Sequence, residues 1–222
     1  FAHAVFYGTG AYLVIVIANG KIPLLAAGTP FMISVVLAAV LAALVAVAIG
    51  LVSFRLTGVY FAMITLGFAQ VFYVFIRGWD WVATAPRDGP SVPFGTHPEG
   101  FRIGIPYVDG ASYAIGRLYG SGLEGFLVLF DLSTTVVSFY MIGLVVLVCY
   151  LAMQRIIHSP FGRVMIAIRE NEERARAIGY NTFYYKLGAF AISGAFAGVA
   201  GALFAGYRRS VTPENTFYFL TT

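Results

Sequence analysis

Four stretches of this chain contain no charged residue over 20 to 22 consecutive positions, and this feature limits the possible folds more than any other. They are residues 31–52, 56–76, 134–153 and 187–207, and a fifth uncharged run, residues 4–18, is shorter. A helix rises about 1.5 Å per residue, so roughly 20 apolar residues cross the roughly 30 Å of hydrocarbon in a bilayer. The pattern predicts an all-α, polytopic membrane helix bundle of about five spans.

The composition indicates lipid rather than water as the surroundings of these helices. Hydrophobic residues make up 59% of the 222 residues and charged residues only 11%, which is under half the usual share in a soluble domain. A soluble domain of this size buries only about 70–75% of its chain surface, too little to hide so much apolar surface. Disorder and most cytosolic enzyme folds are therefore excluded. Cys149 is the only cysteine in the sequence, so an internal disulfide is excluded too.

The charges of the loops predict how the spans are oriented. Residues 154–186 contain six cations, namely Arg155, Arg163, Arg169, Arg174, Arg176 and Lys186. The positive-inside rule places this loop in the cytoplasm. Alternation of the spans then places Arg55 inside and residues 77–125 outside. Lys21 and the pair 208–209 also fall outside, against the rule. The net charge of +4 is too small and too scattered for nucleic-acid binding.

The outer segment, residues 77–125, is long for a connection between two spans. It contains five of the nine prolines and ten glycines, so we expect regular structure to be interrupted there. Two interpretations are open. The segment is either a cap over the helix ends or a docking surface for an external partner, since loops of this length are commonly functional.

Catalytic and metal-binding patterns are absent from the sequence. No cluster of His, Cys, Asp or Glu has the spacing of a metal site. HExxH, GxSxG and the phosphate-binding P-loop are missing as well. The spans contain no acid–base chain of the kind that couples transport to protons. We therefore expect a chain that is not an enzyme, binds no metal, and takes energy from another subunit if it moves a solute uphill.

Small residues recur at every fourth position in the last span. Gly194, Gly198 and Ala202 form one stripe, and Ala197, Gly201 and Ala205 form another. Lipid gives helices no hydrophobic reason to associate, so small residues that allow close backbone approach hold such bundles together. We expect Gly194, Gly198 and Gly201 to be helix-packing residues.

Three polar residues of the span 56–76 are candidates for a translocation path: Tyr60, Thr65 and Gln70. Thr65 and Gln70 are five positions apart, so they share a helix face only loosely. Hydrogen bonds between helices explain these residues at least as well as a role in a pore.

The basic loop 154–186 has the pattern of a stiff helix followed by a turn. Ser159 is a good N-cap and Pro160 suits the first helical position. Residues 163–178 contain no proline or glycine, and Gly179 suits a left-handed helix stop. The sequence predicts one helix, a sharp turn and a short helix that leads into the last span. The loop is either a lever that seats in a groove of a soluble protein or a solvated juxtamembrane segment.

Motifs at three separated places carry a family resemblance. They are residues 2–12 (AHAVFYGTGAY), 58–70 (GVYFAMITLGFAQ), and a series of short motifs at 159–163 (SPFGR), 167–172 (AIRENE), 177–181 (AIGYN), 185–187 (YKL), 192–195 (ISGA) and 200–203 (AGAL). In this order the motifs resemble branched-chain amino-acid ABC permeases of the LivM type, and they cover most of the chain outside residues 77–125. Where that family has a T-G-G stretch after the span 56–76, residues 84–90 read TAPRDGP.

The resemblance implies a partial permease transmembrane domain over residues 1–222, within a longer protein. It also implies that the loop 154–186 docks on a cytoplasmic ATPase. The docking residues implied are Arg169, Glu170, Glu172, Glu173, Ala175 and Gly179. Among them, Glu173, Ala175 and Gly179 match the E-A-A-x-x-x-G pattern of ABC importers, with Arg174 in the second position.

The implied function is import of branched-chain or other hydrophobic amino acids across a prokaryotic inner or plasma membrane. The implied partners are a second permease subunit, two cytoplasmic ATPases, an external substrate-binding protein and membrane lipid. ATP and Mg²⁺ would bind the ATPases, so this chain would hold no cofactor. Two alternatives are open: an ABC permease for urea or short amides, and an autonomous secondary transporter, which would need an ionisable coupling site inside the membrane.

Overall fold

Helices make up nearly all of the structure. The computed structural model describes residues 3–19, 21–22, 31–56, 58–79, 89–90, 135–208 and 210–213. Within these residues the helices are α1 (His3–Ala18), α2 (Phe31–Ser53), α3 (Val59–Arg77), α6 (Thr135–Ile157), α7 (Pro160–Glu170), α8 (Glu172–Ala177) and α9 (Thr182–Arg208). The all-α helix bundle that the sequence predicts is confirmed.

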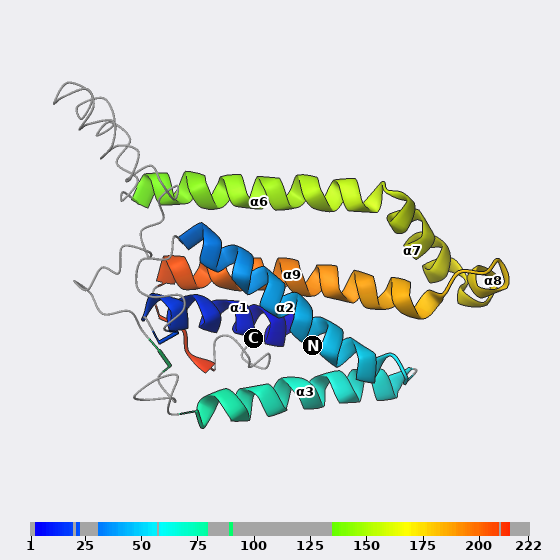
Figure 1. The fold of residues 1–222 in the computed structure, drawn as a ribbon, viewed down its shortest axis with the longest axis horizontal. Coiled ribbons are helices and arrows are strands. Elements are labelled where there is room, and N and C mark those ends of the chain that lie inside the picture. The colour runs from blue at the N-terminus through cyan, green and yellow to red at the C-terminus, as the bar shows by residue number, and fades with distance from the viewer. Residues whose placement is uncertain are drawn as a thin grey trace, which may run out of the picture.

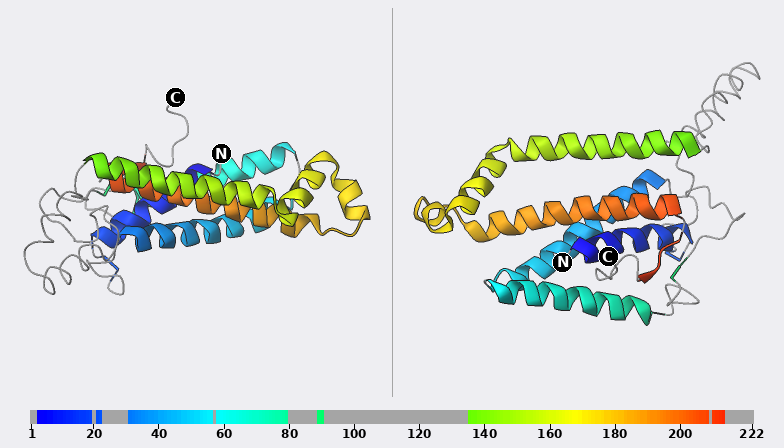
Figure 2. Two further views of the ribbon diagram at one scale, coloured as in Figure 1. Left: turned by 90° about the horizontal axis from the view of Figure 1, so that it is seen from above. Right: turned by 180° about the vertical axis from the view of Figure 1, so that it is seen from behind.

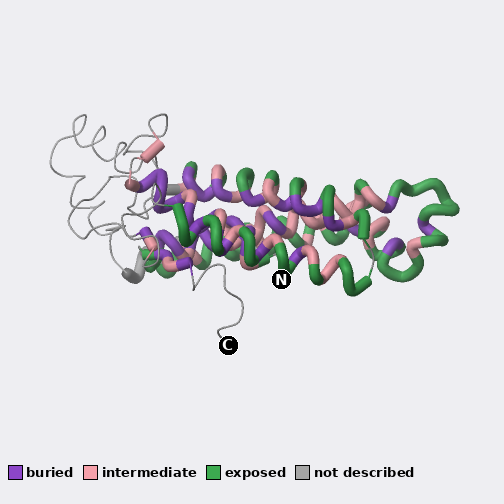
Figure 3. Tube along the Cα trace, turned by 90° about the horizontal axis from the view of Figure 1, so that it is seen from below, coloured by how far each residue is buried: buried purple, intermediate pink, exposed green. Residues whose placement is uncertain are grey.

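Helices α1, α2 and α9 form the centre of the bundle, with α3 along one flank and α6 along the other (Figure 1). The view from behind shows the same order (Figure 2). Two clusters of buried apolar residues lie between the central helices, one around Ile15 and Ala202 and one around Phe6 and Ala42. Buried residues follow these helices, whereas α7 and α8 are mostly exposed (Figure 3).

Three helices are long and apolar enough to cross a membrane, judged by length and composition: Met32–Ser53, Val59–Arg77 and Thr182–Arg208. A bent pair, Ile142–Ile157 followed by Pro160–Glu170 at 67°, makes up to four. Helix α1 is apolar but has only 16 residues. The described residues thus form a polytopic bundle of three to four candidate spans, with α1 as a shorter apolar helix, which its 15 uncharged residues predict.

Two helix boundaries differ from the predicted ones. Helix α3 begins at Val59 rather than at residue 56, because Gly58 precedes it with a φ of 64°, outside the helical region. Helix α9 begins at Thr182, ahead of the uncharged run 187–207, because Lys186 is accommodated inside its first turns. The absence of charge therefore marks the apolar part of a helix and not its full length.

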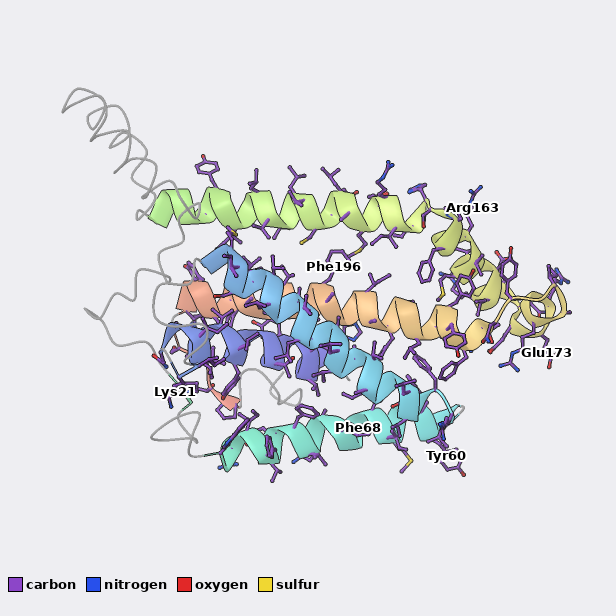
Figure 4. All side chains as sticks on the ribbon, viewed as in Figure 1. Lys21, Tyr60, Phe68, Arg163, Glu173 and Phe196 are labelled. Atoms are coloured by element: carbon purple, nitrogen blue, oxygen red, sulfur yellow. The ribbon has the colours of Figure 1, made fainter. Side chains whose placement is uncertain are left out.

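The two ends of the bundle carry different parts of the chain. Helices α7 and α8 and the connection from α2 to α3 lie at one end, and Lys21 lies at the other (Figure 4). This arrangement agrees with the predicted alternation of the spans. Most of the outer segment 77–125, including residues 84–88, lies outside the described residues. Its role as a cap or a docking surface stays a prediction.

The contact between α1 and α9 brings one backbone against the other. A Cβ atom added at Gly201 would lie 2.0 Å from the backbone oxygen of Tyr7. One added at Gly10 would lie 2.2 Å from the backbone oxygen of Gly198. Real Cβ atoms essentially never approach so closely, so both helices need glycine at this crossing.

The contact between α2 and α9 is made by glycines against alanines. A Cβ atom at Gly194 would lie 2.6 Å from the Cβ of Ala46, and one at Gly198 would lie 2.5 Å from the Cβ of Ala42. The backbone oxygen of Gly198 therefore faces α1, and its Cα hydrogen, where another residue would carry Cβ, faces α2. The small-residue stripes thus let α9 approach both neighbours closely, while larger side chains such as Phe190, which packs edge-on against Phe6, fill the space beside the glycines.

Candidate functional site

Helices α6 and α7 meet at an angle of 67°. Residues 159–162, the predicted helix start, form this bend. The Ser159 side chain caps α7: its Oγ accepts a hydrogen bond from the Gly162 backbone N–H at 3.3 Å and donates one to the Ile156 oxygen at 2.6 Å. Pro160 occupies the first helical position. A Cβ at Gly162 would lie 2.1 Å from the Ile157 oxygen, so glycine allows the chain to turn sharply there.

The predicted single helix over residues 163–178 is wrong, because the chain breaks at Asn171. This residue is extended, with φ −155° and ψ 105°, and separates α7 from α8. Its Oδ1 accepts a hydrogen bond from the Arg174 N–H at 2.9 Å, while its own N–H donates to the Ala167 oxygen at 3.0 Å. Asparagine competes for backbone hydrogen bonds in this way, and an N-cap followed by two glutamates favours a new helix start.

Helix α8 ends in the left-handed turn that the sequence predicts at Gly179, whose φ is 98°. The Gly179 N–H donates to the Arg176 oxygen at 2.9 Å, and the Tyr180 N–H donates to the Ala175 oxygen at 3.2 Å. These two bonds satisfy the last carbonyl groups of α8 in the Schellman arrangement. The chain then enters α9 at Thr182 after a very short connection.

The carboxylate of Glu172 ties α8 to the first turns of α9. Its Oε1 accepts hydrogen bonds from Arg176 Nη2 at 2.7 Å and Thr182 Oγ1 at 3.1 Å. Its Oε2 accepts one from Lys186 Nζ at 2.5 Å, which is also an ion pair. Arg176 Nε donates to the Thr182 hydroxyl at 3.0 Å and completes the network. We refer to these four residues as the Glu172 cluster.

The electrostatics of the Glu172 cluster favour the ionised carboxylate. The hydrogen bond from Lys186 is the main cause that holds the pKa of Glu172 below its ordinary value of 4.5. Thr182 and Arg176 lower this pKa further, while partial burial opposes them. The side chain is 34% exposed, so the cluster sits at the boundary between protein and solvent.

Aromatic side chains pack the start of α7 against α9. The ring of Phe161 stacks on that of Tyr185 with 5.5 Å between centroids, and the Tyr180 ring meets the same tyrosine edge-on at 5.9 Å. A Cβ at Gly188 would lie 3.4 Å from the Phe161 ring, an ordinary contact distance. Ile168 is buried as well, with 5% of its surface exposed. Both short helices are therefore attached to the N-terminal part of α9.

The six predicted docking residues fall into two groups. Arg169, Glu170 and Glu173 are exposed, and none of them forms an ion pair within the part of the chain that the structure describes. Glu173 lies at the far end of the molecule (Figure 4). The other three residues have contacts or roles within the segment itself. Glu172 binds α9, Ala175 is buried with 3% of its surface exposed, and Gly179 forms the turn.

The three candidate path residues of α3 do not come together. Tyr60 and Gln70 are exposed, with Tyr60 near the end of the bundle that carries α8 (Figure 4). Thr65 is buried, and its hydroxyl donates to the backbone oxygens of Phe61 at 3.1 Å and Ala62 at 2.9 Å in its own helix. The hydroxyl of Thr65 thus forms its hydrogen bonds within its own helix, as threonine hydroxyls commonly do. A role for these residues in transport stays a prediction.

Metal-ligating groups are dispersed in the described residues. Among these residues, no group of three or more His, Cys, Asp and Glu side chains could hold a metal ion. His158 bonds locally to the backbone oxygen of Gln154 at 2.8 Å, and His3 bonds to Ser193 at 2.7 Å. The arrangement that the described chain offers is a charged, exposed pair of short helices fixed to a long span.

Comparison with known proteins gives a family match and several relatives. Residues 1–222 match the protein family described as branched-chain amino acid transport system / permease component. The chain is 29% identical over 211 residues to the high-affinity branched-chain amino acid transport system permease protein LivM of Salmonella typhimurium, and equally so to that of Escherichia coli. Each alignment covers 95% of this chain and 46% of the relative, so the chain spans about half the length of these curated proteins.

A third relative matches over a shorter stretch. The probable branched-chain amino acid transport permease protein LivM of Methanocaldococcus jannaschii is 38% identical over 58 residues, which is 26% of this chain and 17% of that protein. No solved structure matches the chain. With its apolar spans and a family match along its whole length, this multi-pass membrane protein belongs to the permease components of branched-chain amino acid transport systems.

Proposed function

We propose that this chain belongs to the permease subunit of an ABC importer that moves branched-chain or other hydrophobic amino acids across a prokaryotic inner or plasma membrane. The observation that carries the proposal is the family match over residues 1–222. The names of the relatives from Salmonella and Escherichia give the substrate class of those proteins, and we extend it to this chain.

Energy comes from other subunits in this proposal. Two cytoplasmic ATPases bind ATP and Mg²⁺, a second permease subunit completes the pathway, and an external binding protein delivers the amino acid. The chain itself is a transport subunit, carries out no catalysis and binds no nucleic acid. The exposed Arg169, Glu170 and Glu173 support this division, because they offer unpaired charge to a soluble partner at one end of the bundle.

The motion starts at α7 and α8. When the ATPases close on ATP, they displace the two short helices, and the spans change between two packed arrangements. Helix α9 is continuous from Thr182 to Arg208, so it carries a displacement into the bundle. Its glycine contacts then pass the displacement to α1 and α2, which it touches most closely. Tyr60, Thr65 and Gln70 of α3 are the polar groups proposed along the path.

Reconstitution of the full-length protein with its ATPases and second permease in vesicles tests the proposed function. We expect ATP-dependent accumulation of leucine, isoleucine or valine when the external binding protein is present. Accumulation of urea instead of these amino acids would favour the short-amide alternative. Accumulation by the permease without any ATPase would establish the autonomous secondary transporter.

A charge reversal at Glu173 tests the docking surface. Glu173→Lys places a cation where a partner meets an exposed carboxylate, and we expect uptake to fall by at least about tenfold, since a like-charge contact across an interface costs several kcal/mol. Membrane insertion and the amount of folded protein should stay unchanged, because Glu173 forms no ion pair within the described chain. Unaltered uptake would remove Glu173 from the docking surface.

A further inference from the structure

We propose that the Glu172 cluster fastens α8 to α9, so that the two helices move as one body and Glu172 positions the docking segment without binding the ATPase itself. The inference rests on the proposed function and divides its docking residues into two kinds. It also adds Arg176, Thr182 and Lys186, which the docking pattern does not contain.

The backbone alone leaves α8 weakly held. With six residues, α8 is far shorter than the roughly 12 residues that an isolated helix needs to be stable in water. On one side it joins α7 through the extended Asn171, and on the other it joins α9 through the left-handed Gly179. A force on α8 would rotate the chain at these two joints before it moved α9. Something besides the backbone must therefore connect the two helices if α8 is to transmit a displacement.

The Glu172 cluster is the polar connection that bypasses the Gly179 joint. It links the first residue of α8 to the first and fifth residues of α9. Both carboxylate oxygens are used, and two of the three donors carry positive charge. Charge-assisted hydrogen bonds of this kind are about twice as strong as neutral ones. Three such bonds on one carboxylate fix its position in a way that a single ion pair does not.

The same contacts keep Glu172 from a partner. Its oxygens are already occupied by Lys186, Arg176 and Thr182, so an ATPase would have to displace a cation from this chain to reach them. Its neighbour Glu173 has no such contacts within the described chain and is exposed. Two adjacent glutamates therefore have different roles, one directed inward to α9 and one directed outward.

The connection continues into the bundle without another joint. Lys186 lies in the second turn of α9, and Gly194 meets Ala46 of α2 eight residues further along the same helix. Eight residues of helix cover about 12 Å, a length over which a helix behaves as a rigid rod. A displacement that reaches Lys186 thus reaches the α2–α9 contact directly.

The first test measures coupling in the reconstituted full-length transporter. We expect Glu172→Gln and Lys186→Met each to raise the ATP hydrolysed per amino acid imported by about twofold, the size of effect that a partly exposed ion pair allows. The ATPases should still co-purify with both variants. The double swap Glu172→Lys with Lys186→Glu should restore the ratio in part, because it re-forms the ion pair with α9 but places the new lysine beside Arg176. Arg163→Met is the matched control, because it removes an exposed cation of α7 that forms no ion pair within the described chain.

Each other outcome of this test argues against a Glu172 cluster that makes α8 and α9 move as one body. A ratio that stays at the wild-type value in Glu172→Gln would overturn the proposal. Loss of ATPase co-purification in that variant would make Glu172 a docking residue instead. A lower yield of folded protein with an unchanged ratio would reduce the cluster to a stabilising contact. If the wild-type complex imports no amino acid with ATP, the proposed function fails, and a second measurement decides the inference.

That second measurement needs no transport. Spin labels at the exposed positions Ala177 and Tyr184 of the full-length protein, with Cys149 and any cysteine outside this sequence replaced, report the distance between α8 and α9. A narrow distance distribution that broadens in Glu172→Gln and narrows at least in part in the charge swap supports the proposed connection between α8 and α9. Equal widths in the wild type and in Glu172→Gln overturn it.

Discussion

Helix α9 is held by opposite means at its two ends. From its middle toward its C-terminal end, Gly194, Gly198 and Gly201 bring its backbone into direct contact with α1 and α2. At its N-terminal end, side chains make the contacts: Lys186 in the Glu172 cluster and Tyr185 under the ring of Phe161. Backbone contacts leave no room for an added atom, whereas long side chains can rearrange. One end of the helix is thus fixed, and the other is an attachment that can be rebuilt.

The surroundings explain the difference. Within an apolar bundle, helices gain by close van der Waals packing, and small residues supply it. Near solvent, the same closeness has no special advantage, and charged groups can pair without the full cost of leaving water. The comparison predicts that an added methyl group is costly at the glycine contacts and nearly harmless at the attachment. The following substitutions examine it from the largest expected effect to the smallest.

Gly201→Ala should have the largest effect. The new Cβ would lie 2.0 Å from the Tyr7 oxygen and 3.1 Å from the Ala11 nitrogen, which are backbone atoms that cannot turn aside. Helix α1 would have to shift, and we expect a loss of about 3 kcal/mol in the free energy of unfolding, the upper range for overpacking. Thermal or denaturant unfolding of the purified full-length protein measures this loss.

The matched controls for this substitution are Gly67→Ala in α3 and Gly143→Ala in α6. An added Cβ has no atom within 4 Å at either position. Since alanine favours the helix over glycine, each control should be neutral or stabilising by up to about 1 kcal/mol. A similar loss at all three positions would show that glycine matters for backbone flexibility in this bundle and not for close approach.

Gly179→Ala separates conformational cost from steric cost. A Cβ at this position also meets no atom within 4 Å, but the φ of 98° is one that alanine rarely adopts. We therefore expect a loss of about 1 kcal/mol, less than at Gly201, from strain in the turn alone. Gly179→Asn should recover part of this loss, because asparagine tolerates left-handed conformations better. If asparagine and alanine behaved alike, strain in the turn would not be the cause.

The apolar part of the fold could be predicted from the sequence, because the uncharged runs report directly on which residues avoid water. The run 187–207 predicts the span α9, and the stop at Gly179 follows because glycine accepts a positive φ more readily than any other residue. The break at Asn171 does not follow from the same reasoning, because a stretch without proline and glycine predicts one continuous helix. The signal was present in Asn171 and the two glutamates after it, which form a helix start.

The Glu172 cluster could be predicted only in part. Glu172 and Arg176 are four residues apart on a helix, a spacing at which opposite charges meet. Thr182 and Lys186 lie ten and fourteen residues from Glu172, beyond the left-handed turn. Their positions depend on how sharply the chain turns between α8 and α9, and no short-range pattern determines that angle. The family pattern also groups Glu172 with Glu173, although only Glu172 forms an ion pair with α9 within the described residues.

Acid should weaken the attachment at Glu172 and leave the glycine contacts unaffected. Because the pKa of Glu172 is held below its ordinary value of 4.5, its contribution is complete above that value and is lost as the pH falls through the lower, folded-state pKa. With the side chain 34% exposed, solvent screens the cluster, and we expect it to stabilise α8 by about 0.5 kcal/mol.

Hydrogen exchange of the α8 amides measures this contribution. Near neutral pH, exchange in Glu172→Gln should be about twofold faster than in the wild type, because the local opening free energy is smaller. The two rates should converge below the ordinary pKa range of glutamate, where the wild-type carboxyl also becomes neutral. High salt should reduce the difference as well, by screening the ion pairs. A difference that persisted unchanged in acid would attribute it to the shape of the side chain instead of its charge.

Gly188→Ala should have the smallest effect and sharpens the comparison most, because it is a glycine of α9 at the attachment end. The added Cβ would lie 3.4 Å from two atoms of the Phe161 ring, an ordinary contact with a side chain that can shift. The gain in helix propensity, at most about 1 kcal/mol, should offset any displacement of the ring, so the unfolding free energy should rise slightly or stay the same. The same substitution at Gly201, thirteen residues along the same helix, meets backbone atoms at 2.0 and 2.8 Å. If Gly188→Ala were as damaging as Gly201→Ala, the N-terminal end of α9 would be packed as rigidly as its centre, and the distinction between a fixed end and an adjustable one would not hold.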